Sequence, residues 1–458
     1  MNRSIFNDVI GPVMRGPSSS HTAASVRIGH LARKLLGEEP VHAIFRFDPS
    51  GSLVTTYQGQ GSAMGLAGGL LGMEITDAKL TDSESIAAEK GLKIEYRFEK
   101  YGATHPNTYL TEVTGVTGKK ITFTALSTGG GIIRLTELNG NKIVDDFDYI
   151  NFLMPVKIKR NPELPFTELR SAYKWVMGKS DSKLSAIAKE YETLIGENSV
   201  EEIEKMSGSI SVVLRNAIEN GMAGTVFADR ILQQQSHLIG QASANNQLIP
   251  NEMVNKIIES ISAIMETKSS IGIIVAAPTA GACGTLGGTL IPVADIMGKT
   301  ENDISDAILA GGIAGVLIDM QAGFAAEEGG CQYETGSAAA MTAAALVELA
   351  GGNAKTALSA ASMALQNTLG LICDPVADRV EVPCLGKNIM AGVNALASAN
   401  MALAGFNAVI PFDEVVMALK EVADSMDHKY RCTCKGGLST TETACSIFKD
   451  LKRGKTAI

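Results

Sequence analysis

Apolar and polar positions alternate along the first part of the chain, as they do in strands with one solvated face. The segments with this alternation are residues 93–98, 108–113, 120–126, 132–138 and 156–159, and residues 41–47 also predict a strand. Ahead of them, Ile28, Leu31 and Leu35 recur at helical spacing, and Gly37 follows as a helix stop. This pattern predicts an α+β fold in which helices pack on a mixed sheet.

The pattern changes at Asn161-Pro-Glu-Leu-Pro165, where two prolines lie within five residues. Residues 165–265 show charged amphipathic helices, and residues 270–425 are rich in Ala, Gly, Leu and Met with little strand signal. Such a composition is typical of helices that are buried on most sides. We therefore predict an α+β domain at residues 1–163, followed by a mostly α-helical domain at residues 164–458.

One uncharged stretch, Ser269–Ala294, is long enough to span a bilayer. Pro278, Pro292 and several glycines interrupt it, which favours a buried helix pair in a soluble core. The formal net charge of −9 argues against nucleic acid as a partner. The first residues show no apolar signal segment, so a cytoplasmic protein without a membrane partner is expected.

The segment Gly16-Pro-Ser-Ser-Ser-His-Thr22 places three hydroxyl groups and one imidazole at a helix start. Free backbone N–H groups and the helix dipole favour an anion there, so Ser18, Ser19 and Ser20 would hold a substrate carboxylate well. His21 would move a proton. The alternative is that the serines only cap the helix.

Two loops of small residues, Ser127–Gly131 and Pro278–Gly281, would let the backbone approach a ligand closely. Neither continues into the Gly-Lys-Ser/Thr of a phosphate-binding loop. His105 and Asn107 lie directly ahead of a predicted strand. The alternative for each loop is a tight turn, and for the histidine a surface residue.

Cys331, Cys373 and Cys384 each stand beside Gly, Pro or Asp, which places them in tight loops or at helix ends. Their spacing is longer than in ferredoxins or zinc ribbons. Three thiolates would leave one iron of a cubane cluster open to substrate. The alternatives are buried apolar cysteines and, less favoured without a secretory signal, a disulfide.

Together and in this order, these segments resemble the iron–sulfur-dependent L-serine dehydratases. The resemblance rests on Gly16–Thr22, His105–Thr108, Ser127–Gly131, Ala277–Gly281, Gly329–Gln332, Ala364–Ala377 and Val380–Cys384. It covers nearly the whole chain and implies the family's β domain followed by its helical α domain, here on one chain. It also implies that Cys331, Cys373 and Cys384 hold a [4Fe–4S] cluster whose fourth iron is free for substrate.

The resemblance implies a lyase that converts L-serine, a small amino-acid substrate, to pyruvate and ammonia. The open iron would act as Lewis acid on the hydroxyl and carboxylate, while a base removes the Cα proton. The predicted catalytic residues are His21, Ser20 and Ser19. The predicted substrate-binding residues are Ser18, Ser19, Ser20, Thr22, Gln60, His105, Asn107, Gly130, Thr279 and Gly281.

The chain departs from the family pattern at two places. Where relatives carry Gly-His-Gly-Thr-Asp, this chain has Gln60 and Ala63 in Gly-Gln-Gly-Ser-Ala. The same chemistry on another β-hydroxy or β-substituted amino acid, such as cysteine, is therefore the alternative substrate prediction. Some relatives also end in a cysteine that reaches the free iron, a place that Cys432, Cys434 or Cys445 would take here.

Two other classes of protein compete with a lyase. A cluster-based redox or oxygen sensor would need a fourth cysteine ligand and an output module. An amidase with a nucleophile among Ser18–Ser20 would stay active without a cluster. Helices faced with Gly and Ala often pack against a second copy, so a homodimer is expected.

Overall fold

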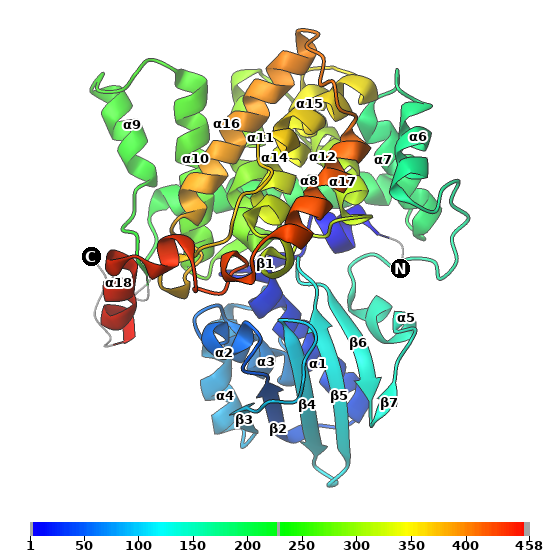
Figure 1. Cartoon of the computed structure of the whole chain (residues 1–458), viewed down its shortest axis with the longest axis vertical. Coiled ribbons are helices and arrows are strands. Elements are labelled where there is room, and N and C mark those ends of the chain that lie inside the picture. The colour runs from blue at the N-terminus through cyan, green and yellow to red at the C-terminus, as the bar shows by residue number, and fades with distance from the viewer. Residues whose placement is uncertain (1–2, 227–229, 453–458) are drawn as a thin grey trace.

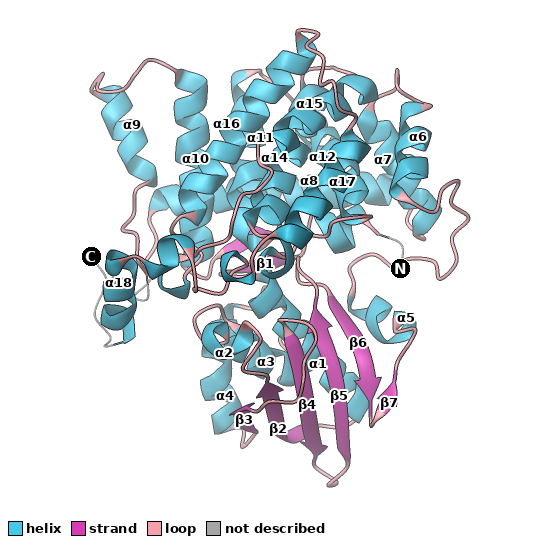
Figure 2. Ribbon diagram, in the orientation of Figure 1, coloured by secondary structure: helices cyan, strands magenta, loops and turns pink. Residues whose placement is uncertain are grey.

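The structure is a computed structural model that describes residues 3–226 and 230–452. A sheet-bearing part and a larger helical part lie end to end, with strand β1 at their junction (Figure 1). The strands of the large sheet are confined to one end of the molecule, and helices make up most of the other end (Figure 2). The predicted fold class, α+β followed by mostly α, is confirmed. None of the helices within the described ranges is long and apolar enough to cross a membrane.

The large sheet is mixed, with six strands in the order β3-β2-β4-β5-β6-β7. Its strands are β2 (Pro40–Phe47), β3 (Lys93–Phe98), β4 (Thr108–Gly115), β5 (Lys120–Ser127), β6 (Ile133–Leu138) and β7 (Asn141–Lys142). Strand β2 pairs in parallel with β3 and antiparallel with β4. Along β4 and β5 buried residues alternate with half-buried ones, so one face of each strand supplies the core.

Helices α1 (Ala24–Leu36) and α3 (Ser62–Leu70) pack together beside this sheet, joined by the short α2 (Leu53–Thr56), α4 (Ser83–Glu89) and α5 (Phe147–Ile150). Helix α1 ends as predicted at Gly37, whose φ of 74° suits a residue without Cβ. The predicted strand at 156–159 is wrong. In this segment only Ile158 forms an isolated β-bridge. The backbone N–H and carbonyl of Val156 are both hydrogen-bonded to the side chain of Asn7, so they are not available to a neighbouring strand.

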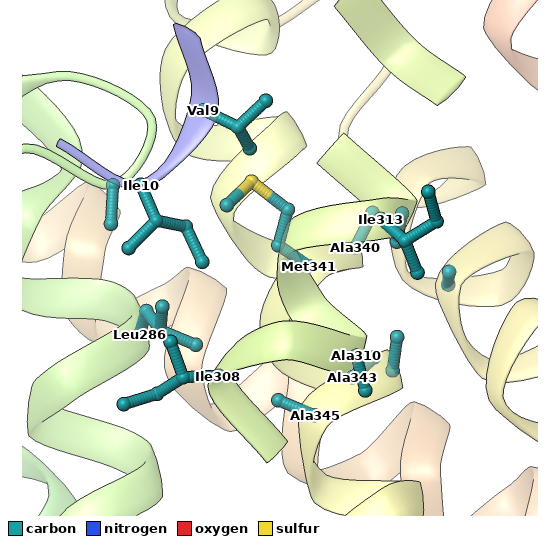
Figure 3. Close-up of a cluster of buried hydrophobic side chains, with 14 of the residues drawn as sticks. Val9, Ile10, Leu286, Ile308, Ala310, Ile313, Ala340, Met341, Ala343 and Ala345 are labelled. Carbon is teal, nitrogen blue, oxygen red and sulfur yellow. The ribbon is translucent and has the colours of Figure 1, made fainter. Parts of the chain in front are cut away.

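The helical part is arranged around α14. Its helices are α6 (Leu169–Met177), α7 (Leu184–Ile195), α8 (Val200–Ala223), α9 (Ser236–Ala244), α10 (Glu252–Ser269), α11 (Cys283–Ile296), α12 (Glu301–Asp319), α13 (Ala326–Gly329), α14 (Ser337–Leu349), α15 (Ala354–Gln366), α16 (Cys384–Leu403), α17 (Phe412–Ser425) and α18 (Glu442–Lys452). Every residue of α14 is buried, and its many alanines let neighbouring helices come close. Figure 3 shows Met341 of α14 between Val9, Ile10 and residues of α11 and α12.

Met341 is fully buried in this core. We expect Met341→Ala to lower the free energy of unfolding by about 2–5 kcal/mol, because the removed atoms leave a cavity that rigid neighbouring helices cannot fill. Denaturant unfolding followed by circular dichroism would measure the change. The matched variant Met417→Ala, on the half-exposed side of α17, should stay within about 0.5 kcal/mol of wild type. Equal losses for the two variants would contradict this account of the core.

The first residues of the chain pack with the helical part and not with the sheet. A single turn at Ile5–Val9 lies on α12. Strand β1 (Val13–Arg15) pairs antiparallel with β8 (Ile273–Val275). The helix pair predicted for 269–294 is therefore wrong in its first half: the β-branched residues of β8 form a strand because β1 offers them a partner.

A buried carboxyl holds the N-terminal turn in place. Glu192 of α7 accepts hydrogen bonds from the hydroxyl of Ser4 (2.9 Å) and the N–H of Ile5 (2.6 Å), and burial raises its pKa to about 8. Because the raised pKa favours the protonated form in the folded state, stability should fall as the pH rises from about 4.5 to 8. A tenfold difference in proton affinity between the folded and unfolded states corresponds to about 1.4 kcal/mol.

We therefore expect Glu192→Gln to flatten the dependence of the melting temperature on pH between 5 and 8. Thermal unfolding across this range would measure the slope. Glu190→Gln, an exposed position on the same helix, serves as the control and should keep the wild-type slope. A wild-type melting temperature that rises through this range would contradict the prediction.

Candidate active site

The loop Gly16–Thr22 leads from β1 into α1, at the junction between the sheet-bearing and helical parts. Residues 19–23 form one wide helical turn that runs directly into α1. The side chains of Ser18, Ser19, His21 and Thr22 are all buried there. The hydroxyl of Ser19 accepts a hydrogen bond from the N–H of Ala280 (3.2 Å), which ties this loop to the helical part.

His21 lies at the centre of this cluster. Its Nε2 is 2.7 Å from the hydroxyl of Thr56, and its Nδ1 is 3.1 Å from Ser18 Oγ and 3.0 Å from Ser20 Oγ. Because the Thr56 hydroxyl donates to the carbonyl of Ser52 (2.8 Å), it accepts from His21 Nε2–H. The free lone pair of the imidazole therefore lies on Nδ1, facing the two serines. Burial lowers the pKa of His21, which favours the neutral ring.

Glu327 completes the cluster from the helical side. Its Oε1 accepts a hydrogen bond from the hydroxyl of Ser20 (3.0 Å) and lies 4.0 Å from His21 Nδ1. Because the Ser20 hydroxyl donates its only proton to this carboxylate, it cannot donate to His21 Nδ1, and the hydroxyl of Ser18 is the donor to that nitrogen. Glu327 was not foreseen from the sequence. The available signal was an acidic residue in the Gly-rich segment just ahead of Cys331.

The cysteines gather on the helical side of the junction, where Cys331, Cys373, Cys384 and Cys432 are all buried. The thiols of Cys331 and Cys373 are hydrogen-bonded to each other, and both belong to one buried cluster with Cys432. Cys384 is the first residue of α16, close enough to Cys331 for the two thiols to interact electrostatically. Burial raises the pKa of Cys384 to about 12.

Of the three cysteines considered for a fold-back role, only Cys432 reaches the other thiols. The preceding residue, Arg431, forms an isolated backbone β-bridge with Cys373, and the N–H of Cys432 donates to the Cys373 carbonyl (3.1 Å). Cys434 lies beside Asp378, and Cys445 is exposed on α18.

Two lysines accompany the cysteines. The Nζ of Lys387 lies 3.6 Å from Cys331 Sγ and donates to Asp374 (2.8 Å) and to the carbonyl of Ile372 (2.7 Å). Lys268 is fully buried, and its charge acts on the Cys384 thiol. Positive charges at these positions favour thiolates, which are the forms that bind metal.

The position of Glu334 beside the cysteines was not predicted from the sequence. Ligand atoms of Cys331, Glu334 and Cys373 lie within 4.8 Å of one another, so these residues can hold a metal ion. Burial, with Glu327 nearby, raises the pKa of Glu334 to about 7. Its position three residues after Cys331 was the only signal in the sequence.

The predicted loop at Pro278–Gly281 lies against Glu334. The Thr279 hydroxyl donates to Glu334 Oε1 (2.7 Å), and a Cβ on Gly281 would meet the same carboxylate at 2.9 Å. Asn388 Nδ2 donates to the carbonyls of Gly281 (2.8 Å) and Cys384 (2.9 Å). The loop and the start of α16 are thus fastened to each other.

Gln60 bridges the two parts of the molecule. Its backbone carbonyl accepts from the Thr22 hydroxyl (3.0 Å), and its side-chain Nε2 donates to Asp378 Oδ1 (3.0 Å). Burial raises the pKa of Asp378 to about 7. Gln60 therefore lies next to the loop that carries His21, but its side-chain amide is already hydrogen-bonded to Asp378.

The remaining predicted residues lie around this centre. His105 Nε2 is 2.7 Å from Glu328, on a cavity of about 370 Å³ that is also lined by Glu327. Asn107 is fully buried and accepts from the Ser52 hydroxyl, while its Nδ2 has no hydrogen-bond partner within the described ranges. Gly130 has a φ of 56°, and a Cβ at this position would lie 3.2 Å from the carbonyl oxygen of Pro278.

The junction therefore combines a neutral imidazole, several hydroxyl donors and a set of soft sulfur ligands. An imidazole that can act as a base, beside residues that could hold a metal ion, is compatible with a metal-assisted lyase, in which the metal polarises the substrate while a base removes a proton.

Comparison with known proteins agrees with this class. The family described as "Serine dehydratase alpha chain" matches residues 169–439. The alpha chain of L-serine dehydratase from Peptoniphilus asaccharolyticus is 37% identical, with 55% of this chain and 86% of that protein covered. L-serine dehydratase 2 of Escherichia coli is 29% identical, with 94% and 97% covered. A probable beta chain from Bacillus subtilis is 46% identical, with 30% and 61% covered. The chain belongs to the serine dehydratase family.

Proposed function

We propose that this protein is an L-serine ammonia-lyase, which converts L-serine to pyruvate and ammonia. The observation that carries the proposal is the contact of His21 with Ser18, Ser20 and Glu327 at the junction, beside the buried cysteines. Relatives named L-serine dehydratase that match nearly the whole chain favour L-serine over cysteine as substrate. They also favour a lyase over a sensor or an amidase.

We propose further that Cys331, Cys373 and Cys384 hold a [4Fe–4S] cluster. The fit rests on the donor set: the buried thiols of Cys331 and Cys373 lie together, the thiol of Cys384 is near enough to interact electrostatically with Cys331, and Lys387 and Lys268 are positioned to balance the charge of thiolates. When bound, the cluster supplies a Lewis acid for the substrate hydroxyl and carboxylate.

The residues of the chain supply binding and proton transfer. Ser19 donates to the substrate carboxylate, because its hydroxyl accepts from Ala280 and donates to no group within the described residues. The hydroxyls of Ser18, Ser20, Thr22 and Thr279 donate to neighbouring protein groups and shape the pocket around the substrate. The Nδ1 of His21 receives the Cα proton, which Ser18 relays because its hydroxyl already donates to that nitrogen. The Cβ–O bond breaks as the Cα proton is removed, so that hydroxide leaves and the enamine forms, and burial of the residues around the substrate keeps bulk water out until then. The imine tautomer of the enamine is then hydrolysed to the 2-oxo acid and ammonia.

Gln60, His105, Asn107, Gly130 and Gly281 belong to the same proposal as supporting residues. Asn107 offers an amide N–H₂ that has no hydrogen-bond partner among the described residues, and Gly281 leaves room beside Glu334. The division into domains at 163/164, a cytoplasmic location and a homodimer stay predictions from the sequence. In support of the division, separate alpha-chain and beta-chain relatives match this one chain.

The test is purification without oxygen, followed by visible absorption, iron content and assays with L-serine and L-cysteine. We expect about four irons per chain and pyruvate from L-serine at a kcat/KM well above that for L-cysteine. A protein without iron after anaerobic reconstitution would refute the cluster. An iron-containing protein that does not convert L-serine but does cleave L-cysteine would refute the proposal that L-serine is the substrate.

A further inference from the structure

A second cavity of about 430 Å³ lies at the junction of the two parts, and its lining shares no residue with the site described above. Its apolar wall is formed by Phe6, Ile10, Ile75, Met154, Met206 and Val213. These residues come from the N-terminal turn, the sheet-bearing part and helix α8. The volume and the apolar lining are those of small-molecule sites.

Arg27 of α1 also lines this cavity, and only 2% of it is exposed. Its Nη1 donates to the carbonyl of Gly131 (2.6 Å), but its Nε has no hydrogen-bond partner and its guanidinium makes no ion pair within residues 3–226 and 230–452. The nearby Asp8 accepts from the N–H of Ser4 (2.7 Å) and attracts Arg27 electrostatically without bonding to it directly. Burial lowers the pKa of Arg27 to about 10.

A buried guanidinium without an ion pair is costly, because its desolvation is not offset by a directly bonded counter-charge. A guanidinium is also a planar fork that matches a carboxylate. The adjoining cavity provides the space for such a group, and its walls suit an apolar tail.

We propose that this cavity binds a small carboxylate with an apolar side chain, whose carboxylate pairs with Arg27. An apolar amino acid and its 2-oxo acid share this chemistry. Glu74, exposed on the same lining, would add an ion pair to the ammonium group of the amino acid alone.

A ligand bound in this cavity would affect the Gly16–Thr22 loop through a short chain of hydrogen bonds. Arg27 holds the carbonyl of Gly131, and in the same loop the Ser127 hydroxyl donates to the carbonyl of Ser20 (2.8 Å). The ligand would also touch both parts of the molecule at once. It is therefore an effector of the serine reaction; this regulatory role rests on the proposed function, whereas binding itself does not.

The test is calorimetry on the full-length protein with L-leucine, 4-methyl-2-oxopentanoate and 3-methylbutan-1-amine, which lacks the carboxylate. We expect saturable binding of at least one of the two carboxylates and none of the amine. Stronger binding of L-leucine would identify the ligand as an amino acid. Stronger binding of 4-methyl-2-oxopentanoate would identify it as a 2-oxo acid. Where L-serine is turned over, the bound carboxylate should shift its KM without competing for the serine site.

Variants of α8 locate the binding. Val213→Trp and Ser209→Trp fill the cavity and should weaken binding about tenfold or more. Val212→Trp, on the neighbouring exposed position, should leave it unchanged. The melting temperature of each variant checks that it folds. Unchanged affinity in both filled variants, equal binding of the amine, or no saturable binding of either carboxylate would overturn the proposal. Failure to turn over L-serine would overturn the proposed function and leave the calorimetric result standing.

Discussion

Replacing His21 with glutamine is expected to lower kcat for L-serine by about 100- to 10,000-fold, because a positioned general base contributes an acceleration of this size. Glutamine keeps a hydrogen-bonding side chain of similar reach, so the hydroxyl of Thr56 retains a partner. It cannot accept and hold the Cα proton near neutral pH. Since the cysteines are untouched, iron content and visible absorption should match wild type.

The matched control is His30→Gln, the same substitution further along α1. His30 Nε2 donates to the carbonyl of Met73 (2.9 Å), away from the cysteines. This variant should keep kcat and iron content. A His21→Gln variant that retains more than about a tenth of the wild-type kcat would contradict the role of His21 as base.

The second large effect is expected for Cys331→Ser, which should lose bound iron, visible absorption and pyruvate formation down to background. The Cys331 thiol contacts both Cys373 and Lys387, so its loss removes a sulfur donor from the group of ligand atoms that the structure brings together. A serine hydroxyl is a harder and far less acidic ligand than a thiol. Iron analysis and an anaerobic pyruvate assay measure both losses together.

Cys445→Ser is the control, because this thiol is exposed on α18. It should keep iron and activity. A Cys331→Ser protein that folds, holds a full complement of iron and still forms pyruvate would exclude Cys331 as a ligand. Cys432→Ser tests a separate point, since Cys432 lies against Cys373. Loss of iron in that variant would add a fourth thiol to the ligand set.

Local sequence patterns predicted much of the fold because they report local physics. Period-two alternation found β4 and β5, since a sheet face buried on one side imposes that period. The stop at Gly37 ended α1 where a left-handed residue was required. The same approach failed at 269–294, because the strand β8 exists only through its distant partner β1.

For the candidate site, the sequence singled out the loop with His21 and the three cysteines from their residue types and resemblance to a family. Glu327, Glu334, Thr56 and Lys387 were missed, because an acid, a hydroxyl or a lysine carries no local mark of its partners. Their positions depend on contacts between segments far apart in the chain. The bridge from Gln60 to Asp378 is of the same kind.

The sequence by itself determined the class of fold, the family resemblance and the residues capable of the chemistry, because periodicity, turn residues and motifs are local properties. Only the tertiary structure decided which ring nitrogen of His21 carries the lone pair and which acid faces Ser20. It also decided that Arg27 is buried beside a cavity with an Nε that has no hydrogen-bond partner in the part of the chain that the structure describes. Hydrogen bonding and desolvation depend on what surrounds a group in space, and that is fixed only when the two parts of the chain pack together.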